Sequence, residues 1–143
     1  MENTNQPNER DRLAHLLTMG VIAGLIASAV NICYMFFYEG ITGYSMNEYI
    51  NVLSVSIATF IPAIFVALIY FSLRRVMKYQ SALNVFLFIV IFFSLLSFIG
   101  PLSNHLPNGD EMPPEFTGLT IPMHILAPVI YITMIVRSVS VKE

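Results

Sequence analysis

The chain has 143 residues, of which 56% are hydrophobic and only 11% are charged, and its formal net charge is −2. Soluble domains average about 25% charged residues, and a soluble fold of this size could not bury so much apolar surface. The composition therefore indicates an integral membrane protein, with the lipid bilayer as its first partner. The small negative net charge argues against nucleic acid as a partner.

Four apolar segments follow a polar N-terminal tail at residues 1–12. Each is near or above the roughly 20 residues that a helix needs to cross a bilayer, and none has Lys, Arg, Asp or Glu in its middle. Alternation with a period of two is absent, so each segment is predicted to be a helix, because lipid offers the backbone no other hydrogen bonds. The helices form one transmembrane domain at 13–138, followed by a C-terminal tail at 139–143, and their expected ranges are 13–38, 48–73, 83–101 and 117–136.

The basic residues all lie on one side of the predicted membrane. The 39–47 and 103–116 loops contain acidic residues but neither Lys nor Arg. By the positive-inside rule, both termini are predicted to face the cytoplasm and these two loops to face outward. Short connections then favour an antiparallel four-helix bundle, with the 103–116 loop either an ordered cap or a loose connection. The basic residues are Arg10, Arg12, Arg74, Arg75, Lys78, Arg137 and Lys142.

Each predicted helix has one face of small or polar side chains. In the first, Gly20, Gly24 and Ser28 recur every four residues, and Asn31 continues the stripe. Asn31 is therefore predicted to face another helix rather than lipid. Polar positions of the four helices lie at similar depths, about 10–12 Å below the outer boundary, and predict an outward-facing polar cavity. The candidate ligand-binding residues are His124, Asn31, Glu48, Asn51, Ser54, Ser97, Asn104 and Tyr131.

His124 is an ionisable residue in a predicted membrane span. Pro128 lies four residues later and cannot donate the hydrogen bond that the His124 carbonyl would accept in a helix, and Pro62 and Pro101 are predicted to free carbonyls in the same way. Two interpretations of His124 stay open. Such a residue often marks a ligand, proton or metal site. Alternatively, a neutral imidazole bonds across to Asn31 or a serine and holds the helices in register.

The chain offers no complete set of residues for metal, redox or nucleophilic chemistry. A zinc site needs three or four ligands, and His105 with Glu48 or Glu39 could join His124 only if the outer loops fold inward. The lone cysteine, Cys33, excludes a disulfide within the chain and is expected to be a small buried hydrophobe. We therefore predict no metal, no cofactor and no catalytic residue.

Three segments carry a recognisable pattern: GVIAGLIASAVNICYMFFY (20–38), GPL (100–102) and PMHILAPVIYITMIVRS (122–138). Together they resemble a family of small four-span bacterial membrane proteins that is classed as a domain of unknown function. The first has an Asn about two turns before the outer boundary, and the last opens with a Met-His pair and ends with a basic residue. The resemblance covers nearly the whole chain. It implies Asn31, Met123 and His124 as family positions and a location in the bacterial inner (plasma) membrane, and it brings no activity.

The leading hypothesis is an integral inner-membrane protein without catalysis of its own. It would bind a lipophilic ligand, a lipid or a membrane protein partner in the outward-facing cavity. The alternative is a small homo-oligomeric transporter or proton-coupled carrier in which His124 titrates. A third hypothesis is a membrane enzyme with His124 as general base, although a partner acid and a nucleophile are missing.

Overall fold

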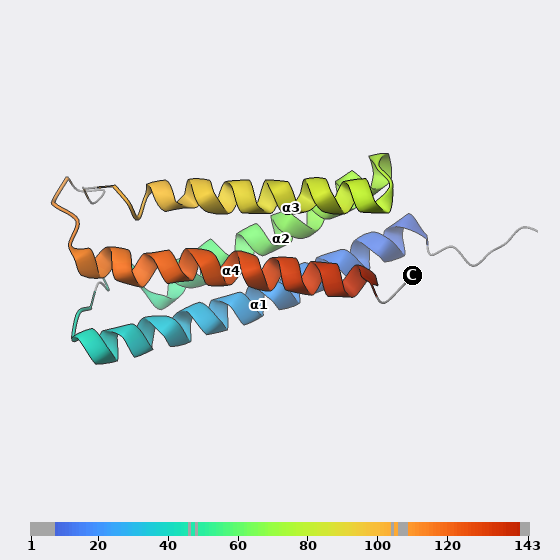
Figure 1. The fold of residues 1–143 in the computed structure, drawn as a ribbon. Coiled ribbons are helices and arrows are strands. Elements are labelled where there is room, and N and C mark those ends of the chain that lie inside the picture. The colour runs from blue at the N-terminus through green and yellow to red at the C-terminus, as the bar shows by residue number, and fades with distance from the viewer. Residues whose placement is uncertain (1–7, 46, 48, 104, 106–108, 141–143) are drawn as a thin grey trace, which may run out of the picture.

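Four helices make up most of the computed structural model, which describes residues 8–45, 47, 49–103, 105 and 109–140. The helices lie alongside one another (Figure 1). All four, α3 together with the short 3₁₀ turn η1, are long and apolar enough to cross a membrane. This confirms the predicted all-helical chain with four candidate membrane spans. The elements are α1 (Glu9–Thr42), α2 (Val52–Val76), α3 (Tyr79–Leu96), η1 (Ser97–Ile99) and α4 (Pro114–Ser140).

Helix α1 is longer at both ends than the apolar run in the sequence. It begins at Glu9, within the expected polar tail, and Glu9 and Asp11 place negative charge in the first turn, where the helix dipole favours it. At the other end, Gly43 adopts a φ of 68°, and its N–H donates to the Glu39 carbonyl. Such a left-handed glycine is a common helix terminator, since it has no Cβ to clash.

The ends of α2 and α3 are set by local interactions that the hydrophobicity of the sequence does not reveal. Asn51 caps α2 because its side chain accepts from the Ser54 N–H, while the Ser54 hydroxyl accepts from the Asn51 N–H. Helix α3 gives way to η1 after Leu96, so the buried Pro101 lies beyond the helix. The expectation that Pro101 frees a carbonyl inside a long helix is therefore wrong. The tighter turn ends the helix before the proline, which could not extend it.

Helix α1 contacts both α2 and α4, and its small residues allow α2 to approach closely. A Cβ added to Gly20 would lie 2.9 Å from the Cβ of Ala67, and one added to Gly24 would lie 2.9 Å from Cδ2 of Phe60. Glycine at these positions brings the two backbones together, which is the main source of helix association in lipid. On the opposite side of α1, Cys33 is exposed, so its expected burial is wrong. It occupies the side of the helix that faces away from α2 and α4.

Several hydrogen bonds join the helices to one another. The hydroxyls of Ser28 in α1 and Thr59 in α2 are 2.6 Å apart. The Tyr34 hydroxyl donates to the Gly118 carbonyl of α4 at 3.0 Å, and the Tyr131 hydroxyl of α4 donates to the Thr59 carbonyl. Bonds of this kind contribute about 0.6 kcal/mol each in membrane proteins. They therefore set the register of α1, α2 and α4 more than they add stability.

Helix α3 buries side chains over its first two-thirds, from the end that joins it to α2, at Ala82, Phe86 and Val90. There the rings of Phe86 and Tyr70 meet edge to face with their centroids 5.2 Å apart, and both are buried. Phe86 thus fills a gap between the helices, whereas Phe92, farther along α3, is exposed. In Figure 1 the ribbons of α2 and α3 diverge from their connecting turn.

Candidate functional site

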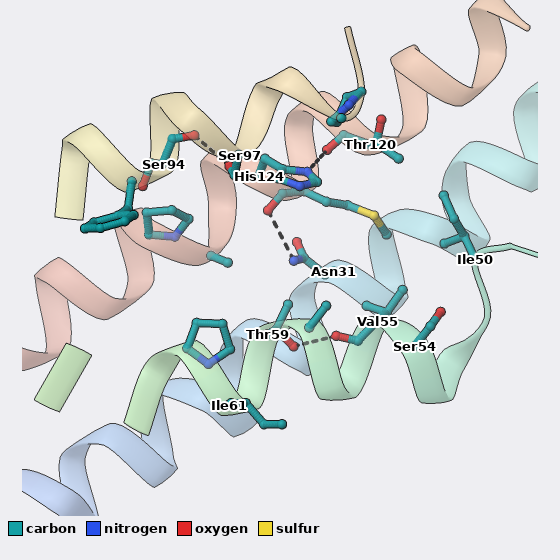
Figure 2. A pocket seen from close by; sticks show the side chains of 18 of the residues that line it. Asn31, Ile50, Ser54, Val55, Thr59, Ile61, Ser94, Ser97, Thr120 and His124 are labelled. Atoms are coloured by element: carbon teal, nitrogen blue, oxygen red, sulfur yellow. Dashed lines mark hydrogen bonds between the residues drawn. The ribbon is translucent and has the colours of Figure 1, made fainter. Parts of the chain in front are cut away.

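A cavity of about 1110 Å³ lies between α2, α3 and α4. Its volume is slightly above the range of small-molecule sites, which measure roughly 300–1,000 Å³. The walls consist mostly of Ile, Val, Phe, Ala and Pro side chains, with a few polar groups among them. Figure 2 shows that Asn31 of α1 lies between His124 of α4 and Thr59 of α2. Polar groups from three helices therefore converge on one region of a largely apolar space.

The structure brings together most of the candidate residues from the sequence. Asn51 is an exception, because it caps α2 from the solvent-exposed end and does not line the cavity. Glu48 and Asn104 lie outside the described residues. The predicted residues that line the cavity are Asn31, Ser54, Ser97, His124 and Tyr131.

Asn31 is the most deeply buried polar side chain of the cavity, with only 1% of its surface exposed. Its Nδ2 donates to the Met123 carbonyl of α4 at 3.3 Å, which confirms that Asn31 faces another helix. Its Oδ1 is buried and has no hydrogen-bond partner among the described residues. A buried acceptor without a partner costs about 1–3 kcal/mol, and native proteins rarely contain one. Among the side chains that line the cavity, Oδ1 of Asn31 is therefore the buried acceptor that a donor would satisfy.

His124 lines the cavity but is not bonded to Asn31 or to a serine within the described part of the chain. Its Nδ1 lies 2.8 Å from the Thr120 carbonyl, one turn earlier in α4. The bond across to Asn31 or a serine, which one of the two interpretations of His124 expected, is therefore not formed, because the Thr120 carbonyl is within reach of the ring and Asn31 binds the Met123 carbonyl instead. A carbonyl only accepts, so Nδ1 carries the hydrogen and Nε2 of the neutral ring is an acceptor.

The hydroxyl groups of the wall are already used as donors. Every serine and threonine hydroxyl that lines the cavity donates to a backbone carbonyl, as does the hydroxyl of Tyr131. Because a hydroxyl has one hydrogen, these groups can offer a ligand only their lone pairs. The donor and acceptor residues are Ser54 to Asn51, Thr59 to Val55, Ser94 to Val90, Ser97 to Ser94, Ser103 to His105, Thr120 to Phe116 and Tyr131 to Thr59.

Thr59 is the polar residue of the site that the sequence reasoning missed. It contacts Ser28 of α1 and accepts from Tyr131 of α4 through its carbonyl, so it lies where three helices meet. The signal that could have found it is a second stripe spaced by four residues, which begins at Val55 and continues through Thr59 to Ala63. This stripe is buried, and it has the same spacing of four residues as the small-residue stripe of α1.

The described residues contain no group of three or more His, Cys, Asp or Glu side chains that could hold a metal ion. Comparison of the chain with protein-family models, with curated proteins and with solved structures finds no match.

Proposed function

We propose that the protein is an integral membrane protein that binds a lipophilic ligand in the cavity between α2, α3 and α4. The observation that carries the proposal is the cavity itself, with about 1110 Å³ of space and apolar walls around the polar group at Asn31. A large apolar pocket with a few convergent polar groups is typical of small-molecule sites. A concave site of this kind favours a lipid or similar ligand over the flat surface of a protein partner.

The side chains at the cavity edge indicate how a ligand enters. Ile61 and Phe65 of α2 and Phe93 of α3 line the cavity, yet they are 48%, 59% and 61% exposed. They therefore border an opening between α2 and α3, the two helices that diverge from their turn. In a bilayer, an opening edged by such side chains faces hydrocarbon, so the ligand enters from the lipid.

The proposed membrane arrangement is an antiparallel bundle in the bacterial inner (plasma) membrane with both termini in the cytoplasm. The positive-inside rule supports it, since basic residues cluster at the turn after α2 and at the chain ends. Arg75 near the end of α2 lies 3.4 Å from Glu9 at the start of α1, as expected if both lie at one membrane face. In this arrangement Asn31 and His124 lie in the outer half of the bilayer, and the ligand comes from the outer leaflet.

Three further hypotheses from the sequence stay predictions. The first is membership of the family of four-span bacterial proteins that Asn31 and the Met123–His124 pair suggest. The second is a homo-oligomeric transporter or proton-coupled carrier, for which the place of His124 in the cavity wall is the supporting observation. The third is a membrane enzyme with His124 as general base.

Filling the cavity tests the proposed function. Ala58 lines the cavity on α2, and Ala58→Trp would occupy its space. In native mass spectrometry of protein extracted with its own lipids, we expect the unaltered protein to retain a bound lipophilic molecule and Ala58→Trp to lose most of it. Ala29→Trp is the matched control, because Ala29 is an exposed alanine of α1 outside the cavity. Equal retention by the two tryptophan variants would refute the proposal.

A further inference from the structure

The polar groups of the cavity wall offer mainly hydrogen-bond acceptors, because most of their own N–H and O–H groups already donate to other atoms of the protein. Asn31 Oδ1 is buried without a partner among the described residues, and one of the two hydrogens on its amide nitrogen donates to the Met123 carbonyl. His124 adds the acceptor Nε2, since Nδ1 is bonded to the Thr120 carbonyl. The serine and threonine hydroxyls of the wall donate to backbone carbonyls, and the lining residues Pro62 and Pro128 have no N–H at all. A ligand that satisfies Oδ1 must bring its own hydrogen.

The wall is also without formal charge. The described residues that line it include no Lys, Arg, Asp or Glu. A phosphate or carboxylate at Asn31 would therefore place its oxygens against the acceptor Oδ1, with the imidazoles of His105 and His124 as the only basic side chains among the described lining residues, and an ammonium group would be buried without a counter-ion. Both arrangements are costly at membrane depth. The polar end of the ligand must then be a neutral donor.

We infer that the ligand is a neutral lipid alcohol whose hydroxyl donates to Oδ1 of Asn31 while its hydrocarbon fills the cavity. This inference rests on the proposed function and names its ligand class. The hydroxyl satisfies the one buried acceptor of the cavity wall that has no partner within the described residues. The hydrocarbon lies against the apolar wall and extends out through the opening between α2 and α3. Diacylglycerols and single-chain alcohols share this chemistry and differ only in the number of chains.

Lipid pairs that differ in one hydrogen-bond donor test the inference on the unaltered full-length protein. Radiolabelled dioleoylglycerol and oleyl alcohol are each compared with their O-methyl ethers for binding to the protein in detergent micelles. The alcohols are expected to bind about tenfold more tightly, equivalent to about 1.4 kcal/mol, because the ether leaves Oδ1 unpaired. Dioleoyl phosphatidate is expected to bind more weakly than dioleoylglycerol. The ratio between the two alcohols reports whether one chain or two is preferred.

A substitution at Asn31 tests whether this side chain causes the preference for alcohols over ethers. Asn31→Leu keeps the approximate size of the side chain and removes Oδ1, so the alcohol-to-ether ratio is expected to fall to about one. Thr133→Val is the matched control, since Thr133 is an exposed hydroxyl of α4 outside the cavity, and it should keep the full ratio. The ether comparison needs no substitution, so it stands even if Asn31→Leu fails to fold.

The outcomes separate this inference from the proposed function. If none of the lipids binds, or if Ala58→Trp binds them as well as the unaltered protein does, the lipid site itself is refuted. If the lipids bind and Ala58→Trp blocks them, but alcohols and ethers bind equally, the site stands and the donor inference is overturned. Tighter binding of phosphatidate than of dioleoylglycerol would overturn it as well.

Discussion

Helices α1 and α2 meet at a close-packed seam at Gly20. Its geometry predicts that adding a single methyl group at this position destabilises the protein. In Gly20→Ala, the new Cβ would lie 2.9 Å from the Cβ of Ala67 and 3.1 Å from the carbonyl oxygen of Ala63. Carbon atoms in contact prefer separations of about 3.5–4.0 Å. Neither neighbour is the end of a flexible side chain that could move aside. The two helices must therefore separate by roughly 0.6 Å or more along this part of the seam.

The size of the effect follows from two opposing contributions to the free energy of unfolding. Overpacking of a well-packed interface costs about 1–3 kcal/mol. Alanine is favoured over glycine in a helix by about 1 kcal/mol, which offsets part of that cost. We expect Gly20→Ala to lower the free energy of unfolding by about 1–2 kcal/mol. Gly40→Ala makes the same change in the same helix where no atom lies within 4 Å, so it should be neutral or slightly stabilising.

Titration with sodium dodecyl sulfate in mixed micelles, followed by circular dichroism, measures these differences in the free energy of unfolding. Ala67→Gly provides a second test, because it removes the carbon that the new methyl group would meet. In the double variant, the cost of Gly20→Ala should be smaller than in the unaltered background, which is a favourable coupling between the two sites. The reasoning is refuted if Gly20→Ala is as stable as Gly40→Ala, or if the two seam substitutions are additive.

Two other predictions concern the register of the helices and the topology. Tyr131→Phe removes the hydroxyl that donates to the Thr59 carbonyl, so the free energy of unfolding should fall by about 0.6–1.5 kcal/mol in the same titration; an unchanged value would show that this bond adds no stability. In a Cys33→Ser background, an impermeant maleimide applied to intact cells should label Gly109→Cys, and it should label Met77→Cys only after the membrane is permeabilised. The reverse pattern would contradict cytoplasmic termini.

The sequence by itself determined the features that depend on local composition and spacing. The four spans could be found because each is an apolar run without charges, and lipid allows such a run only as a helix. The inward face of α1 could be found because Gly20, Gly24, Ser28 and Asn31 follow the helical period. The predicted ends of the helices were less accurate. Gly43 ends α1 through its local backbone geometry, and the N-terminal turn of α1 is polar, so an apolar run reveals neither end.

Only the tertiary structure decided which partner each polar group has and where the cavity lies. Helical spacing gives the direction of a side chain about its own axis, but not the distance or rotation of the neighbouring helix. Asn31 therefore binds the Met123 carbonyl and not His124, whose ring reaches the Thr120 carbonyl instead. The contact of Phe86 with α2 near the connecting turn is likewise a property of the assembled helices. Because α3 packs against α2 at that end and diverges beyond it, the cavity opens between them.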